Sequence, residues 1–253
     1  MISPDGINAL EQFILAKYYL TTQVYRHKVR MITDEMLLRA IRLGVEVDNI
    51  DELRQLYSYD GSQNFSVNYV KWDDSRFLFF FRDPKFEGMH CHELLTRLHE
   101  RRLFKRIYDK PLDALSPECR DPLSRISEPQ NVARRDQLEQ KIEKVVSESG
   151  VKIDAGKYHP ERFVVVNAYT VRSVRDQTIA NEAAILVDRR PAPKPFEEES
   201  LLFSSINQQF SKARVEVYAP VSYDTFTMRQ TLLSSLDGPI TQGLEEFFKG
   251  EQR

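Results

Sequence analysis

The sequence has few of the residues that mark specialised protein classes. Its 253 residues include only two cysteines, Cys91 and Cys119, which exclude a disulfide framework and lack the paired spacing of zinc ligands. Its nine glycines never form GxGxxG or GxxxxGK[ST], the motifs of phosphate-cradling loops. No apolar run approaches the ~18 residues that cross a bilayer, and no secretory leader opens the chain. We therefore expect a cytoplasmic protein with no membrane partner.

An excess of one charge is missing as well. The chain has 36 Lys and Arg against 38 Asp and Glu, a formal net charge of -2, which argues against a globally basic coat for nucleic acid. Hydrophobic residues make up 41% of the chain, as is typical of a folded globular protein.

The first part of the chain has the pattern of helices. Apolar residues recur at mainly helical spacing after Ile7, and neither proline nor glycine interrupts them before Gly44. The run Thr33-Asp34-Glu35 predicts a new helix start, because an oxygen-bearing cap precedes acidic residues. Gly44 is expected to cap the end of that helix.

Further helices are expected up to residue 108. One is predicted over 49–56, followed by a loop over 57–64. The apolar block 77–81 fits a buried strand or a short helix, and the preceding Asp73 and Asp74 favour the helix. Residues 87–108 predict an amphipathic helix with a basic end.

Four prolines between residues 110 and 129 predict a linker, and the pattern changes after it. We expect a charged helix over 131–149, a strong strand over 162–168, weaker strands over 183–187 and 213–218, a helix over 199–210, and a break at residues 237–239 before a last helix. The predicted fold is mainly α. A helical unit (1–110) and a Pro-rich linker (111–130) precede a small α+β unit with a short sheet (131–253).

The segment 17–28 holds the main candidate site. At ~100° per residue, Lys17, Thr21, Tyr25 and Lys28 fall on one helical stripe. Two ammonium groups, a hydroxyl and a phenol suit an anionic ligand that carries a ring. A solvated stripe whose tyrosine packs on a neighbouring helix remains the alternative.

Two other clusters have plain structural explanations. His90, His92 and His99 invite a metal site, but histidines within one helix splay around its axis, so a charged, partly exposed helix is favoured. The basic block 101–106 suits phosphate or RNA, or else the negative end of a helix dipole. His159 and the basic residues within 171–175 are expected in loops.

Three segments carry a resemblance to a known family. Residues 10–28, with Lys17-Tyr18-Tyr19 and Gln23-Val24-Tyr25-Arg26-His27-Lys28, resemble the helix that follows the catalytic core of HD-domain phosphohydrolases, including dNTP triphosphohydrolases and the vertebrate SAM-and-HD-domain enzyme. Residues 69–78 and 101–106 resemble later parts of that family in the same order. The strand over 162–166 is similar to one in its C-terminal appendage.

This resemblance implies a helical enzyme that releases tripolyphosphate from a dNTP, with water activated at a divalent metal. By position, Lys17 matches a phosphate-contacting arginine, although lysine lacks the bidentate fork. Tyr25 matches a tyrosine near the sugar and base, and Thr21 stands where the vertebrate enzyme has histidine. Lys28 matches the lysine of a His-Lys pair, which in the vertebrate enzyme belongs to a regulatory-nucleotide region.

The metal-binding His-Asp motif is missing from these residues. None of the five histidines is followed by aspartate. We therefore expect the catalytic half and its divalent metal to lie upstream of Met1, and no cofactor or metal site in the chain itself. The chain alone is predicted to be inactive. As part of a dNTP triphosphohydrolase it is expected to provide nucleotide-pocket surface through Lys17, Tyr25 and Lys28 and to form a homo-oligomer.

Two alternatives stay open. The chain could be a stand-alone module that senses nucleotides or binds proteins without catalysis. A weaker alternative is RNA binding through the basic block 101–106.

Overall fold

The computed structural model describes residues 1–25, 27–154, 162–170, 186–189, 192–203 and 213–250. It is mostly helical with one three-stranded and one two-stranded antiparallel sheet, which confirms the predicted fold class. The helices within these ranges include α1 (Ile7–Tyr19), α2 (Lys28–Glu46), α3 (Asp51–Tyr57), α4 (Gln63–Tyr69), α5 (Asp74–Phe81), α6 (His90–His99), α7 (Pro117–Ser124), α8 (Val132–Glu148), α9 (Phe196–Glu199) and α11 (Phe226–Gly250). Short turns of 3-10 helix lie at Pro4–Gly6, Pro84–Phe86, Leu112–Ala114 and Pro129–Asn131.

The main sheet has the order β1-β5-β2, and both outer strands run antiparallel to the central one. β1 is Lys105–Pro111, β2 is Val165–Thr170 and β5 is Ala213–Ala219. The register of β1 against β5 shifts between Arg106 and Tyr108, which marks a bulge. The strand predicted over 213–218 is confirmed as β5, and the one predicted over 162–168 is confirmed from Val165 onward as β2. The small sheet pairs β3 (Leu186–Val187) with β4 (Lys194–Pro195), and residues 183–185 of the predicted strand lie outside the described residues.

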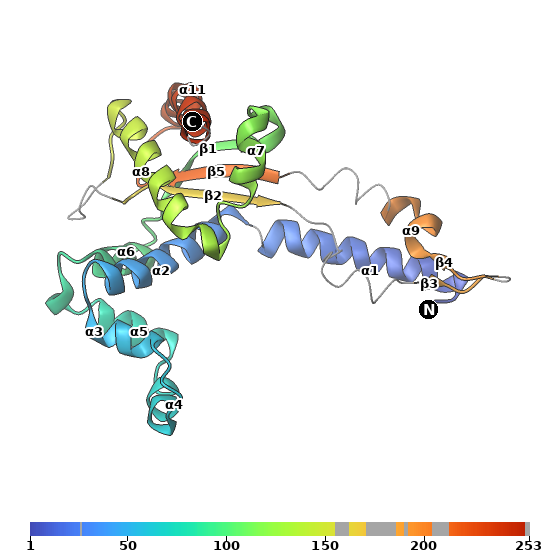
Figure 1. Cartoon of the computed structure of the whole chain (residues 1–253), viewed down its shortest axis with the longest axis horizontal. Helices are drawn as coiled ribbons and strands as arrows, with labels where there is room; N and C mark the ends of the chain where they lie inside the picture. The colour runs from blue at the N-terminus through green and yellow to red at the C-terminus, as the bar shows by residue number, and fades with distance from the viewer. Residues whose placement is uncertain (26, 155–161, 171–185, 190–191, 204–212, 251–253) are drawn as a thin grey trace.

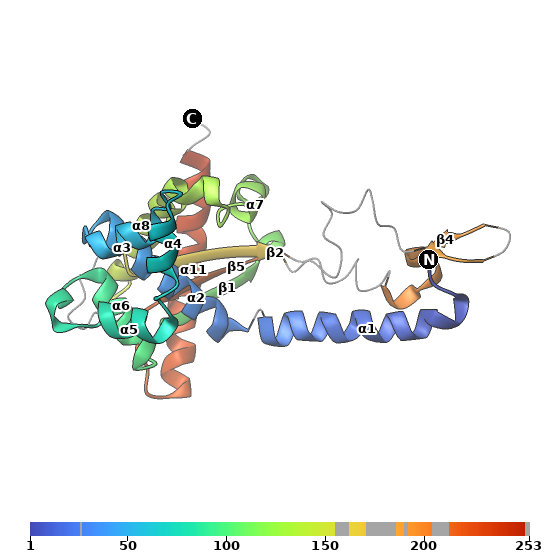
Figure 2. The same cartoon turned by 90° about the horizontal axis from the view of Figure 1, so that it is seen from below.

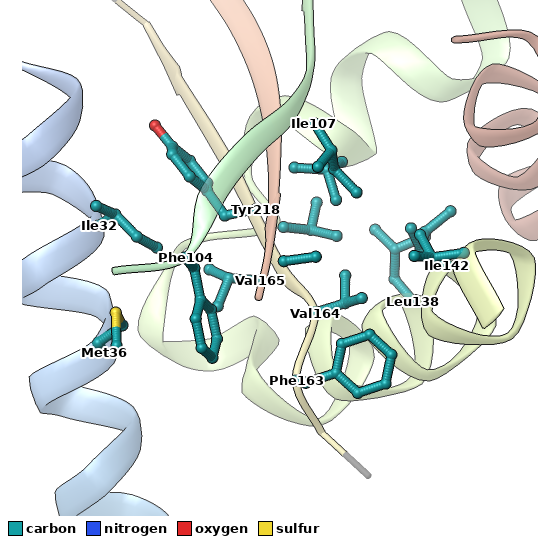
Figure 3. Close-up of a cluster of buried hydrophobic side chains, with 14 of the residues drawn as sticks. Ile32, Met36, Phe104, Ile107, Leu138, Ile142, Phe163, Val164, Val165 and Tyr218 are labelled. Carbon is teal, nitrogen blue, oxygen red and sulfur yellow. The ribbon is translucent and has the colours of Figure 1, made fainter. Parts of the chain in front are cut away.

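The core lies on both faces of the main sheet. Figure 1 shows α7, α8 and α11 over one face, and α2 and α6 on the side of the other. Figure 3 shows Val164 and Ile107 directed toward Leu138 and Ile142 of α8. On the opposite face, Phe104, Val165 and Tyr218 lie toward Ile32 and Met36 of α2. All of these side chains are at most 3% exposed, so the sheet and its two helical layers form one continuous core.

A second, smaller core holds α1 apart from the main one (Figure 2). Ile14 of α1 packs against Val187, Phe196 and Phe203, and Ile2 pairs with Val187 in a parallel bridge. The helix thus packs against residues 186–189 and 192–203 and extends away from the main sheet as an arm.

Several predicted helix boundaries are confirmed by their caps. The Asp73 side chain accepts a hydrogen bond from the Arg76 N–H, so the block that follows is a helix, α5. The helix predicted over 49–56 is α3, and α8 fits the helix predicted over 131–149. Gly150 ends it with a φ of 73°.

Other predicted boundaries are wrong. Gly44 does not cap a helix: it lies inside α2, where an added Cβ would meet Leu53 Cδ1 at 2.4 Å and Cys91 Cβ at 3.1 Å. Here glycine allows close packing of three segments. The helix predicted over 87–108 ends at His99, and Arg101 takes a φ of 57° before the chain enters β1. Long-range pairing with β5 decides the conformation of residues 105–108.

The prolines do not act as predicted at every position. Pro239 lies inside α11, which runs unbroken from Phe226 to Gly250, so the predicted break at 237–239 is wrong. Residues 111–130 contain α7, and their Leu112, Leu123 and Ile126 are at most 4% exposed in the main core. The division into units at residues 110 and 130 stays a prediction.

One predicted helix falls largely beyond the described ranges. α9 ends at Glu199, the residue where the helix over 199–210 was expected to begin, and residues 204–210 lie outside the described residues.

Candidate functional site

The candidate site lies where α1 leads into α2. α1 continues into a π-helix, η2 (Leu20–Tyr25), and the chain becomes extended at His27. The His27 ring Nδ1 accepts a hydrogen bond from the Val29 N–H at 3.3 Å, so His27 caps α2. α2 therefore begins at Lys28 rather than at the predicted Thr33, whose hydroxyl bonds to the Arg30 carbonyl oxygen inside the helix.

This local fold changes the predicted stripe. A single stripe through Lys17, Thr21, Tyr25 and Lys28 requires one continuous α-helix, but a π-turn and an extended residue intervene. The prediction of one α-helical stripe is therefore wrong. The role of Lys17, Tyr25 and Lys28 as nucleotide contacts stays a prediction.

The three residues are nevertheless accessible. Lys17 is exposed near the end of α1, and it forms no ion pair within the described part of the chain. Tyr25 is 50% exposed, and the Arg30 guanidinium lies 5.4 Å from the centroid of its ring. Lys28 is exposed at the first turn of α2. A cation beside an open aromatic face is suited to an anionic ligand with a ring.

The exposed face of this region is also apolar. Phe13 and Lys17 are four residues apart and Leu20 follows three later, so their side chains share one face of the helix. Phe13 is 63%, Leu20 43% and Val24 52% exposed. We call these four exposed side chains the arm face (Phe13, Lys17, Leu20 and Val24); the first two belong to α1 and the last two to η2. The small core beside it leaves the arm face open to solvent.

Lys28 also borders a hollow of about 190 Å³ between the start of α2, the start of β1 and the start of α11. We call it the basic hollow; its lining residues are Lys28, Val29, Ile32, Leu103, Phe104, Lys105, Arg106, Tyr218, Tyr223 and Arg229. It combines cationic and aromatic side chains. The Arg229 Nε is buried and finds no hydrogen-bond partner among the residues that the structure describes. A bound acceptor such as a phosphate oxygen would satisfy that N–H group.

Not every cation of the basic hollow is available. Arg106 Nη1 lies 2.5 Å from Glu216 Oε1 and 2.9 Å from Asp109 Oδ2. The Tyr218 hydroxyl donates to the other Glu216 oxygen at 2.7 Å, and burial together with this carboxylate raises the Tyr218 pKa. Tyr218 is thus a neutral hydrogen-bond donor at physiological pH, and free positive charge comes from the other side chains.

The basic block 101–106 is divided between two structures. Arg102 pairs with Glu100 at 2.7 Å, and Lys105 opens β1. Since Arg106 is paired as well, part of the block is neutralised by carboxylates of the same chain. RNA binding through it stays a prediction.

The histidines of α6 have different surroundings from one another. The His90 Nδ1 lies 2.8 Å from Asp48 Oδ1, and the same carboxylate accepts from the backbone N–H groups of His90 and Cys91. Asp48 therefore caps α6 from a distant part of the chain. Across the described residues, no group of three His, Cys, Asp or Glu is placed to hold a metal ion. Residues 155–161 and 171–175, with His159 and the second basic cluster, lie outside the described residues.

Comparison with known families identifies the chain. A family model described as HD associated region matches residues 1–232. The chain belongs to the HD-associated region family. Such regions stand alongside HD-domain proteins and are distinct from the HD catalytic domain, so the predicted kinship is confirmed at this coarser level. A search of curated proteins gave no match.

Two further properties bear on this HD-associated region. Among the helices that the structure describes, none combines the length and apolar character needed to cross a bilayer. The sequence pattern indicated Lys28 but did not predict the basic hollow, because Tyr218 and Arg229 lie about two hundred residues after Lys28 in the chain. Arg229 is a single basic residue in the amphipathic helix α11, and nothing in its neighbouring sequence indicates a binding site.

Proposed function

We propose that this HD-associated region completes the nucleotide pocket of an HD-domain dNTP triphosphohydrolase. The observation that carries the proposal is the arm face, where apolar side chains lie exposed along α1 and η2 beside Lys17, a cation with no ion pair among the described residues. Burial of Phe13 alone against a partner would contribute about 1.5–3 kcal/mol, so an HD catalytic domain is a suitable cover. The family match to an HD-associated region supports that choice of partner.

Each candidate residue has a role in this proposal. Lys17 supplies positive charge to the phosphates as a point charge, because its ammonium group lacks the fork of an arginine. Tyr25 offers its ring face and hydroxyl to the sugar and base. Lys28 contributes to the basic hollow, where a second nucleotide would regulate the enzyme.

The metal chemistry belongs to the catalytic domain in this proposal. A divalent ion there activates the attacking water. None of the five histidines of this chain is followed by aspartate, so its residues do not fit the His-Asp motif. This region binds and orients the nucleotide, and excludes water from it. We accordingly expect negligible hydrolysis by the chain alone.

The proposal is tested by nucleotide binding and hydrolysis. The chain is assayed alone, and again with its HD catalytic domain, in the presence of manganese. Lys17→Ala is expected to weaken dNTP binding by about tenfold, since one charge-assisted hydrogen bond is lost. Lys152→Ala, an exposed lysine elsewhere, is the matched control. Wild-type-like dNTP affinity after both Lys17→Ala and Tyr25→Phe would contradict the proposed roles.

A second candidate function follows from the basic hollow. An HD-associated region that binds a nucleotide there, without any catalytic partner, would act as a sensor. The buried Arg229 Nε, which has no hydrogen-bond partner in the described part of the chain, supports this alternative. Nucleotide binding to the isolated chain, lost in Arg229→Leu but retained in Lys17→Ala, would favour the sensor over the pocket wall.

A further inference from the structure

The π-helix η2 brings Tyr25 onto the same face of the helix as Lys17, although the four predicted residues form no single α-helical stripe. Positions 17 and 25 are eight apart, so in a continuous α-helix the two side chains would lie ~80° apart around the axis. A π-turn holds one residue more than an α-turn, which turns the residues after it back by ~100°. Tyr25 therefore lies within about 20° of Lys17, and one ligand can contact both side chains.

Lys17 and Tyr25 lie at different levels along this helix. Two turns separate them, which corresponds to about 11 Å along the axis. In the proposed function Lys17 binds the phosphates, so the sugar and base of the nucleotide lie toward Tyr25. The base is then placed where η2 meets α2, and the side chains at that junction are those that contact it.

Arg30 is a cation at this end of the site. Its guanidinium carbon lies 5.4 Å from the centroid of the Tyr25 ring. Arg30 also pairs with Asp34, but 3.6 Å separates Arg30 Nε from Asp34 Oδ2, and the two side chains are 52% and 58% exposed. This distance is too long for a hydrogen bond, and such exposed pairs are weak. Among the described residues, the guanidinium of Arg30 has no hydrogen-bond acceptor, so its N–H groups are available to a ligand.

We infer that Arg30 selects the base of the nucleotide, and that guanine and thymine bind more tightly than adenine and cytosine. An arginine side chain carries hydrogen-bond donors and no acceptor. Guanine and thymine have a carbonyl oxygen at the position where adenine and cytosine have an amino group, which is itself a donor. A base beside Tyr25 therefore accepts a hydrogen bond from Arg30 in the first case, whereas in the second case two donors face each other.

This inference rests on the proposed function, because it requires the phosphates to lie on Lys17. It adds a specificity-determining residue, Arg30, and a substrate class, the dNTPs whose base carries that carbonyl group. A purely structural role for Arg30 has a different consequence. If its guanidinium only held the Tyr25 ring in place, its removal would weaken the binding of all four dNTPs to the same extent.

The affinities of the four dNTPs test the inference. Non-hydrolysable analogues of dGTP, dTTP, dATP and dCTP are titrated by calorimetry into the chain together with its HD catalytic domain, in the presence of manganese. We expect dGTP and dTTP to bind about tenfold more tightly than dATP and dCTP, which lies within the usual range for one base contact.

Variants of Arg30 should change this preference. Arg30→Lys still presents only donors, so it should keep part of the preference. Arg30→Gln should bind the four analogues alike, because an amide group both donates and accepts. The matched control is Arg125→Gln, which removes another exposed arginine that pairs with a carboxylate four positions away, and it should keep the full preference.

The results separate this inference from the proposed function. Lys17→Ala should weaken the binding of all four analogues equally. If it does so while the wild-type protein binds the four alike, the inference is wrong and the proposed function stands. A preference that persists in Arg30→Gln, or an equal loss of affinity for all four analogues in that variant, would also overturn the inference. If Lys17→Ala changes no affinity, or if no analogue binds, the proposed function fails.

Discussion

Asp48 shows how one side chain joins distant parts of the main core. Its carboxylate accepts hydrogen bonds from the first N–H groups of α6 and from the His90 ring, although 42 residues separate it from His90. The positive end of a helix favours such a carboxylate. Burial alone would raise the pKa of Asp48, but these hydrogen bonds lower it below its ordinary value.

Replacement of Asp48 by asparagine is expected to destabilise the fold by about 1–3 kcal/mol at pH 7, because a buried acceptor of three hydrogen bonds loses its charge. The folded-state pKa is depressed, so this stabilisation is present above the unfolded pKa of about 4 and is lost as pH falls through the folded value. Urea unfolding of wild type and variant at several pH values measures it.

The control for this prediction is Asp51→Asn, which removes an exposed carboxylate in the next helix. It should change stability by less than about 1 kcal/mol. A wild-type advantage over Asp48→Asn that stays constant down to pH 2 would show that the carboxylate charge is not responsible.

At the scale of elements, an ion pair joins α2 to α8 and to the start of β2. Arg39 pairs with Glu139, and both side chains are 5% exposed. The same guanidinium donates to the carbonyl oxygen of Val164 at 2.6 Å, while Glu139 accepts from the Val166 N–H at 2.9 Å. Each group therefore satisfies backbone as well as its charged partner, and the pair fixes two helices around one strand.

Removal of the Glu139 carboxylate should show how much the fold depends on its pair with Arg39. Glu139→Leu is expected to destabilise the fold by about 3–5 kcal/mol, because Arg39 and Arg135 would both lose the carboxylate with which they pair. The matched control is Asp136→Leu, which breaks an ion pair with Arg42. The Arg42 side chain is 24% exposed and the Asp136 side chain 29% exposed. That change should be smaller by at least about 2 kcal/mol. Equal losses in urea midpoint for both variants would mean that burial of the pair is unimportant.

Pro239 is a second element-scale feature. It lies within α11, where it cannot donate to the carbonyl four residues earlier. Pro239→Ala is therefore expected to stabilise the chain by about 1–3 kcal/mol, measured as an increase in thermal midpoint. Pro117→Ala should have little effect, since Pro117 occupies the first turn of α7, where its missing N–H is tolerated. A lower midpoint for Pro239→Ala would show that the proline has a packing role instead.

The sequence predicted those elements whose signals are local. The Asp73 cap, Gly150 and the Val-rich strand β2 needed no information beyond their neighbours. The predictions were wrong where long-range contacts determine the structure. α11 continues through Pro239 because it packs on α7 and α8. Residues 105–108 form a strand because they pair with β5.

The candidate site shows the same division. The residue types alone were enough to select Lys17, Tyr25 and Lys28, because two lysines and a tyrosine occur within twelve residues. Their arrangement in space could not be predicted, because the π-helix η2 has no proline, glycine or charge pattern that distinguishes it from an α-helix. The buried Arg229 Nε, without a hydrogen-bond partner in the described ranges, lies beside the start of α2 through long-range contacts that the sequence does not reveal.

At the scale of the whole molecule, the two cores stabilise different parts of the chain. The main core surrounds the three-stranded sheet, whereas the small core holds α1 as an arm (Figure 2). Only Ile14 of α1 is buried, so the arm face contributes little to the stability of the chain itself. Substitutions there should separate partner binding from folding.

Phe13→Ser and Val24→Ser test this separation. Together they should leave the urea midpoint within about 0.5 kcal/mol of wild type, because both side chains are more than half exposed. If the proposed HD catalytic domain covers the arm face, its affinity should fall by about 10- to 100-fold, since apolar burial at the proposed contact would be lost. Ile14→Ser is the contrasting variant, because its buried side chain is needed by the small core and its loss should destabilise the arm. Unchanged affinity in the double variant would mean that the partner covers another surface, whatever its effect on nucleotide binding.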